Sequence, residues 1–196
     1  MENRSTLLEQ KREFTRTRLL DEALELFRTK GYVETTAEDI ASAVGCSRAT
    51  FYLHFKSKSE IMIGILERVW PSVDDSVDEF AAAVAAGLTK DELRVRISND
   101  RAVWSMYAGG LRAFNVAQMV DPEVTKWLES KAARAVERVS RAAPEKIHMS
   151  PRVQRTRIVI LSRIANGALE MEDSVDCPSS EVVDYLTDLW ADLICV

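Results

Sequence analysis

The sequence has few residues that break helices and few that cross-link chains. Its 196 residues include 7 glycines and 5 prolines, which together are about half of the usual share. So few breakers favour long helices over a many-turned β sandwich. The three cysteines, Cys46, Cys177 and Cys195, form no CxxC pair. We therefore expect reduced thiols rather than a disulfide framework or a metal site.

Long apolar segments are also absent. The uninterrupted apolar runs, residues 158–161 and the alanine-rich residues 80–88, are far shorter than the ~20 residues of a membrane-spanning helix. No basic segment followed by an apolar one marks the N-terminus as a secretory signal. We therefore expect a cytoplasmic protein that has no membrane partner.

The motifs of common enzymes are missing as well. The sequence contains no P-loop, GxGxxG, HExxH or GxSxG motif, and its two histidines, His54 and His148, lie far apart. A catalytic pair of His148 with Cys177 or Cys195 is one alternative. A cation site at the acidic residues 170–173 is another, although a solvated helix end explains the same residues. We expect no enzymatic activity, no cofactor and no metal site.

The charge is unevenly distributed along the chain. The formal net charge is −5, from 26 basic and 31 acidic side chains, but residues 1–60 carry equal numbers of each sign. This part contains two basic groups, residues 4–18 and residues 45–59, and the second group includes no acidic residue. Because phosphate groups respond to the local electrostatic field rather than to the net charge, an acidic protein with such basic groups can still bind nucleic acid. A solvated helix face is the alternative for either group alone.

Apolar spacing and capping signals predict an all-α fold. Hydrophobic residues make up 46% of the chain, which indicates a folded rather than a disordered protein. Thr36, with Asp39 three residues later, and Ser47 are expected helix caps. A full capping box opens at Ser57, residues 89–92 open another helix, and Asp121-Pro122 is a typical helix start. About nine helices are expected, at residues 15–30, 36–44, 47–54, 57 to about 70 with a kink or an end at Pro71, 72–86, 89–105, 111–119 after a break at Gly109-Gly110, 122–142, 151–171 and 179–194.

Residues 36–58 have the pattern of a helix, a short turn at Gly45-Cys46 and a second helix. This pattern is typical of a helix-turn-helix, in which the second helix enters the major groove of DNA. Arginine can bond bidentately to guanine, and hydroxyl groups can bond bases or phosphates. The first turn of the second helix presents three such side chains, Ser47, Arg48 and Thr50. Corners between packed helices have similar spacing, so a purely structural interpretation stays open on spacing alone.

Further candidates for DNA contact follow this turn. Tyr52, His54 and Lys58 have spacings that suit phosphate contacts. Unpaired N–H groups at a helix start favour phosphate, and this applies to the helix that begins near Lys58 and to the one that begins at Thr36. We expect Phe51 and Phe55 to anchor the short helix in the core.

Residues 15–66 closely resemble the N-terminal domain of TetR-family regulators. The resemblance lies in Phe27, in Gly31-Tyr32 and in the segment GCSRATFYLHFKSK over residues 45–58. It implies that the DNA-contact positions are Thr36, Ser47, Arg48, Thr50, Tyr52, His54 and Lys58. Cys46 stands where an aliphatic residue is common; a small apolar side chain suits this position, with a redox sensor as the alternative.

The resemblance also implies two domains and their partners. Residues 1–60 are expected to form a helix-turn-helix DNA-binding domain, with residues 1–12 flexible, and residues 61–196 a helical ligand-binding and dimerisation domain. The implied partners are a double-stranded, palindromic DNA operator, a small-molecule effector and a second copy of the chain.

The C-terminal residues suggest where an effector and a partner bind. Large apolar side chains with two polar neighbours predict an apolar effector pocket; packing in the core is the alternative for each of them. The pocket residues are Phe80, Trp104, Met106, Tyr107, Phe114, Asn115, Gln118 and Trp127. The last two helices have more than one apolar stripe, which predicts that they form a four-helix bundle between two protomers. Burial of these stripes within one chain is the alternative. The expected dimer residues are Ile158, Leu161, Ala165, Leu169, Leu186, Leu189, Trp190 and Leu193.

The sequence therefore predicts a ligand-responsive one-component transcriptional regulator, a repressor that is released from DNA by a small apolar molecule. Activation is the alternative within this class, because the position of the operator relative to the promoter decides between the two. A helical carrier of small molecules with no DNA role and an enzyme built into the helical bundle are the alternatives from other classes.

Overall fold

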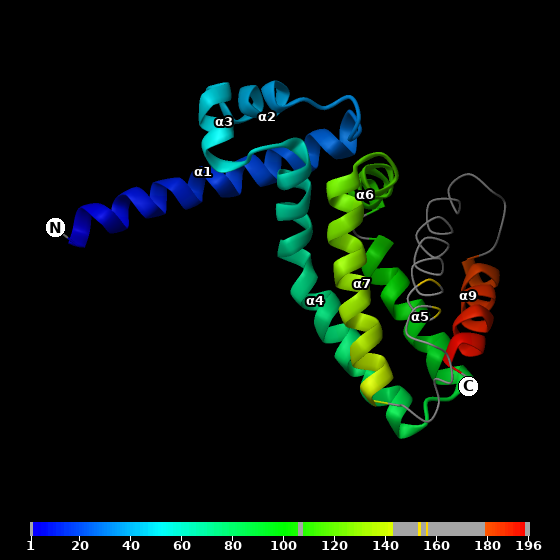
Figure 1. Ribbon diagram of the computed structural model, residues 1–196. Helices are drawn as coiled ribbons and strands as arrows, with labels where there is room; N and C mark the ends of the chain where they lie inside the picture. The colour runs from blue at the N-terminus through cyan, green and yellow to red at the C-terminus, as the bar shows by residue number, and fades with distance from the viewer. Residues whose placement is uncertain (1, 106–107, 143–152, 154–155, 157–178, 195–196) are drawn as a thin grey trace. The chain divides into compact units, whose positions relative to one another are not determined.

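A computed structural model describes residues 2–105, 108–142, 153, 156 and 179–194. These ranges contain eight helices and no strand, which confirms the all-α prediction. The helices are α1 (Glu2–Thr29), α2 (Ala37–Val44), α3 (Arg48–His54), α4 (Lys58–Ala86), α5 (Lys90–Ser105), α6 (Ala108–Val120), α7 (Pro122–Ala142) and α9 (Ser179–Ile194) (Figure 1). Most of the helix predicted over residues 151–171 lies outside the described residues. None of the described helices is both long and apolar enough to cross a membrane.

The chain divides into two compact units. The first unit comprises Met1–Val69 and Arg112–Thr125, and the second comprises Trp70–Leu111 and Lys126–Val196. Three helices, α4, α6 and α7, contribute residues to both units. The chain therefore passes from one unit to the other within helices rather than through flexible linkers.

The first unit is built around one face of α1. Leu19, Leu20, Ala23 and Phe27 recur at helical spacing and are almost completely buried. The remaining core side chains come from the three following helices: Ile40, Phe51, Phe55 and Ile61. A Cβ atom on Gly64 would lie 3.0 Å from Leu20 Cδ2, so the absent side chain at Gly64 lets α4 approach α1 closely.

Local capping groups fix the starts of the helices. Thr36 Oγ1 accepts a hydrogen bond from the Asp39 N–H at 3.1 Å, and the Asp39 carboxylate accepts one from the Thr36 N–H at 2.8 Å. Thr89 and Glu92 form the same reciprocal pair before α5. Gly45 ends α2 with φ +76°, a left-handed conformation that favours glycine. These positions agree with the predicted caps, because capping depends on residues only three apart.

Three predicted helix boundaries are wrong. α4 does not end at Pro71 but continues to Ala86, so the separate helix expected from Ser72 is part of it. A proline inside a helix costs about 3 kcal/mol, and buried side chains before and after it, such as Ile65 and Val84, stabilise the helix. α6 includes Gly109 and Gly110, where a break was expected, since an interior glycine costs only about 1 kcal/mol. α1 begins at Glu2, well before Thr15, because its polar residues have adequate helix propensity without an apolar stripe.

The core of the second unit joins α4, α5 and α9. Val84, Leu88, Leu93 and Ala191 form a buried cluster, against which Leu189 and other apolar side chains pack. Ion pairs line this contact, with Lys90 Nζ 2.6 Å from Asp188 and Arg94 beside Asp184. These pairs are exposed, so burial of the apolar cluster contributes most of the stability.

Candidate nucleic-acid interface

The short helix α3 is held in place by two phenylalanines. α3 has seven residues, too few for a stable helix in water. The side chains of Phe51 and Phe55 are 0% and 1% exposed, and their ring centres are 6.1 Å apart. The predicted anchoring role of both residues is therefore confirmed. On the other side of α3, Tyr52 is 44% and Leu53 74% exposed.

The polar side chains at the start of α3 are exposed at Ser47 and Arg48 and partly exposed at Thr50. Ser47 caps the helix, since its Oγ accepts a hydrogen bond from the Thr50 N–H at 3.1 Å. The two hydroxyl oxygens of Ser47 and Thr50 are 2.9 Å apart. The Arg48 guanidinium lies 5.5 Å from the centre of the Tyr52 ring. The structure thus groups four of the seven predicted DNA-contact residues around the N-terminal turn of α3, as hydrogen-bonding groups accessible from outside.

Thr36 is exposed at the start of α2, as the sequence suggested. Its hydroxyl also donates to Asp39 Oδ2 at 2.8 Å. Lys30 Nζ lies 2.7 Å from the same carboxylate oxygen. The hydroxyl of Thr36 therefore already serves the helix cap, so the phosphate contact predicted here stays a prediction.

Lys58 makes a structural contact that the sequence reasoning missed. Its ammonium donates hydrogen bonds to the carbonyl oxygens of Tyr32 at 2.7 Å and Val33 at 3.0 Å. The same nitrogen lies 4.4 Å from the centre of the Tyr32 ring. Partial burial lowers the pKa of Lys58. Lys58 thus fastens the loop after α1 to the start of α4, and the phosphate contact predicted for it stays a prediction.

A carboxylate between α6 and α7 joins three segments of the first unit. Asp121 Oδ2 accepts hydrogen bonds from the Tyr32 hydroxyl at 2.5 Å and from Ser59 Oγ at 2.6 Å. Its other oxygen accepts from the backbone N–H groups of Glu123 and Val124 at the start of α7. We call Tyr32, Ser59 and Asp121 the Asp121 joint. Capping of α7 by Asp121 was predicted, whereas the two side-chain partners were not.

Charge in the Asp121 joint is stabilised by hydrogen bonds. Partial burial acts to raise the pKa of Asp121. The hydrogen bonds from Ser59, Tyr32 and the α7 backbone act in the opposite direction and outweigh it, so the pKa of Asp121 lies below its usual value. Burial and the adjacent carboxylate raise the pKa of Tyr32. Asp121 is therefore the acceptor and Tyr32 the donor throughout the neutral pH range.

His54 is half-buried at the end of α3. Burial lowers the pKa of His54, the charges of Arg12 and Arg16 lower it further, and Glu13 acts in the opposite direction. The lowered pKa favours the neutral imidazole at pH 7 in the free protein, in which one ring nitrogen donates a hydrogen bond and the other accepts one.

The predicted effector residues fall in both units. Phe114 and Gln118 are buried in the first unit, where Asn115 also lies. In the second unit, the ring centres of Phe80 and Trp190 are 6.1 Å apart, and those of Trp127 and Trp70 are 4.7 Å apart. Met106, Tyr107 and the side chain of Trp104 lie outside the described residues. The effector pocket stays a prediction.

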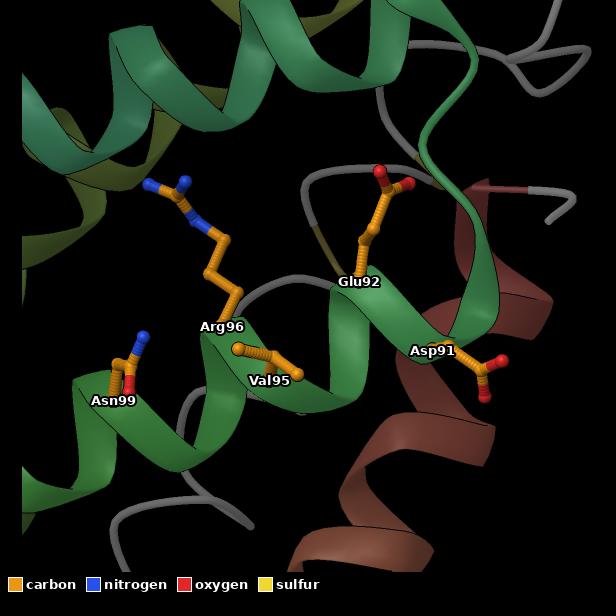
Figure 2. A pocket seen from close by; sticks show the side chains of 5 residues that line it. All are labelled: Asp91, Glu92, Val95, Arg96 and Asn99. Carbon is orange, nitrogen blue, oxygen red and sulfur yellow. The ribbon is translucent and has the colours of Figure 1, made fainter.

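Two hollows lie on the described surface of the second unit. One of about 370 Å³ is lined by Asp91, Glu92, Val95, Arg96 and Asn99 of α5 (Figure 2). The other, of about 320 Å³, shares Glu92 and Arg96 with it. Neither is lined by a predicted effector residue. Arg96 donates to the Ser76 carbonyl at 2.6 Å and Glu92 caps α5, so both shared side chains have structural partners.

The predicted dimer residues that the structure describes pack within the chain. Leu186 is buried, and Leu189 and Trp190 pack partly against the core cluster of the second unit. Tyr185 on the same helix is 60% exposed. The side chain of Leu193 and all of Ile158, Leu161, Ala165 and Leu169 lie outside the described residues. The dimer interface stays a prediction.

Cys46 is free and half-buried, which fits the small apolar role expected for it. In the part of the chain that the structure describes, no group of three His, Cys, Asp or Glu side chains could hold a metal ion.

Comparisons with known proteins agree on the segment that contains these residues. The family described as "Bacterial regulatory proteins, tetR family" matches residues 19–65. TcmR, an HTH-type transcriptional regulator of Streptomyces glaucescens, is 51% identical over 49 residues, which are 25% of this chain and 22% of TcmR. The chain thus spans about a fifth of the length of TcmR in this match.

Similarity at lower identity extends over most of the chain. EthR of Mycolicibacterium smegmatis, another HTH-type transcriptional regulator, is 25% identical over 186 residues, which are 90% of this chain and 84% of EthR. The structure of Thermus thermophilus FadR, a TetR-family repressor in complex with lauroyl-CoA, has a TM-score of 0.58 at 19% identity and covers 91% of this chain and 92% of that one. TcmR and EthR are transcriptional regulators, and Thermus thermophilus FadR is a transcriptional repressor.

The Lys58→Met variant should lower the free energy of unfolding by about 1–2 kcal/mol, because it removes charge-assisted hydrogen bonds to two carbonyl groups. Urea unfolding of the chain without DNA measures this difference. Lys56→Met is the matched control, since Lys56 is exposed two residues earlier. Equal destabilisation by the two substitutions would contradict the structural role of Lys58.

The Asp39 carboxylate should make stability depend on acid pH. Hydrogen bonds from Lys30 and from Thr36 lower the pKa of Asp39 to about 2, below its unfolded value of about 4. The carboxylate therefore stabilises the fold above pH ~4, and this contribution disappears as the pH falls toward ~2. The destabilisation caused by Asp39→Asn should shrink over the same range in urea unfolding at stepped pH. A pH-independent difference would be evidence against this assignment.

Proposed function

Because the chain belongs to the TetR family of bacterial regulatory proteins, we propose that it is a ligand-responsive one-component transcriptional repressor. It binds a palindromic DNA operator as a homodimer and is released by a small apolar molecule. The observation that carries the proposal is the start of α3, where the exposed Ser47 and Arg48 and the partly exposed Thr50 are held over a buried phenylalanine anchor. This is the geometry that a recognition helix needs.

The DNA-binding unit of the proposal spans residues 1–60. α3 enters the major groove with its N-terminal turn, where Arg48 bonds bidentately to a guanine and the hydroxyl groups of Ser47 and Thr50 bond bases or phosphates. Tyr52 and His54 contact the sugar-phosphate backbone, as do the helix starts at Thr36 and Lys58. The free neutral form of His54 suits a hydrogen bond to a phosphate oxygen.

Residues 61–196 form the effector-binding and dimerisation part. Two copies associate through the C-terminal helices and place their recognition helices about one DNA turn apart, ~34–36 Å, or farther apart on the same side of the duplex. Exposed Tyr185 on α9 is available to such an interface. The effector is an apolar molecule. Thermus thermophilus FadR binds lauroyl-CoA, whose acyl chain is an apolar group of this kind.

Effector binding acts on DNA affinity through the helices shared by both units. α4 begins at Lys58 beside α3 and continues into the second unit, and α7 leaves the Asp121 joint in the same way. A change in the second unit can therefore reach the DNA-binding helices without a flexible linker in between. The effector must bind the two states of the protein with unequal affinity, since only that difference shifts the equilibrium.

The experiment that tests the proposal is selection of bound duplexes from a random pool, followed by affinity measurements on the enriched sequence. Arg48→Ala should cost about 1–3 kcal/mol on that sequence and relax the preference at the position that Arg48 contacts. Arg18→Ala, which removes the same charge from an exposed site on α1, should leave the sequence preference unchanged.

Two results would count against this function. If the wild-type chain enriches no sequence at low and moderate salt, the protein does not act by operator binding. If Arg48→Ala weakens binding equally on enriched and unselected duplexes, α3 does not recognise bases through Arg48.

A further inference from the structure

The N-terminal half of α1 extends beyond the core of the first unit. The buried residues of α1 begin at Leu19, whereas the helix begins at Glu2. Figure 1 shows this half, in dark blue, continuing past α3. Its apolar side chains Leu7, Leu8 and Phe14 are each at least half exposed. Packing within the first unit therefore does not explain why the helix is this long.

Arginines on one face of this half approach the end of the recognition helix. The Arg16 guanidinium lies 4.5 Å from the centre of the Phe55 ring, directly after the last residue of α3. Arg12 precedes Arg16 by four residues, so it occupies the same face one helical turn farther out. The charges of Arg12 and Arg16 both act on His54, which places them beside the end of α3.

The two arginines differ in what they already contact. Arg16 is half-buried and stacks on Phe55, whereas Arg12 is exposed. No salt bridge among the described side chains involves Arg12. The acidic side chain that also acts on His54 is Glu13, which lies about 100° around the helix from Arg12. Arg12 thus presents a cation beside α3 and His54, next to the surface proposed to face DNA.

We propose that Arg12 binds a backbone phosphate of the operator, so that the DNA surface extends from α3 onto α1. This inference rests on the proposed function and adds a residue outside the helix-turn-helix. The contact is to phosphate rather than to a base, because Arg12 lies beside the end of α3 and not at the base-reading first turn. A phosphate there is bonded by the guanidinium and by the neighbouring His54, which are both donors available to an anion.

The test compares Arg12→Gln with Arg18→Gln in the full-length chain. Both substitutions remove one positive charge from an exposed position on α1, but residue 18 is six positions from residue 12, about 120° away around the helix. The measured quantities are the affinity for the enriched duplex and for an unselected duplex, each over a range of salt concentrations. Urea unfolding of each variant verifies that the fold is retained.

Arg12→Gln should weaken binding by a similar factor on both duplexes and reduce the salt slope by about one per protomer. Arg18→Gln should leave the slope unchanged. Arg12→Lys should restore most of the slope, because a phosphate contact needs the charge rather than the planar guanidinium.

Two outcomes overturn the proposal and are distinct from each other. If wild-type chain binds the enriched duplex and Arg12→Gln behaves like Arg18→Gln, the phosphate contact is wrong while the operator function stands. If the wild-type chain binds no duplex, both the operator function and the contact at Arg12 are wrong.

Discussion

A helix of seven residues cannot hold its shape in water on its own, and α3 has this length. The surface that we propose to meet DNA depends on the burial of Phe51 and Phe55 beneath α3. Gly45 adds the left-handed turn that aims α3 away from α2. Together they leave the start of α3 exposed while its opposite side is immobilised, which is what base recognition requires.

The Asp121 joint and Lys58 extend this constraint to the ends of the longer helices. Asp121 binds a tyrosine from the loop after α1 and a serine from the first turn of α4, while its second oxygen caps α7. Lys58 fastens the same loop through two carbonyl groups. Burial makes these polar contacts costly to lose. The positions of α4 and α7 are thereby tied to the segment that supports the recognition helix.

The parts of the fold that the sequence could predict are those controlled by neighbouring residues. Helix caps at Thr36, Ser47 and Asp121 depend on groups two or three positions away, and the structure contains all three. The hydrogen bond from Tyr32 to Asp121 joins residues that are 89 positions apart in the sequence, and no local sequence pattern predicts such a contact. The boundary predicted at Pro71 is wrong because buried side chains of α4 on both sides outweigh a proline penalty of about 3 kcal/mol. The break predicted at Gly109-Gly110 is wrong because each glycine costs a helix only about 1 kcal/mol. The inward bonds of Lys58 reach carbonyl groups 25 and 26 positions earlier in the chain, so the local pattern that suggests its phosphate contact gives no sign of them.

The central claim is that the exposed start of α3 is the surface that meets DNA. Hydrogen–deuterium exchange of the chain, free and bound to an enriched duplex, tests this claim directly because it reports which backbone amides become protected. The account predicts slower exchange across residues 36–58 and around Arg12, with the hollow on α5 (Figure 2) unaffected. Protection confined to α5 and α9, with no change over residues 36–58, would contradict it.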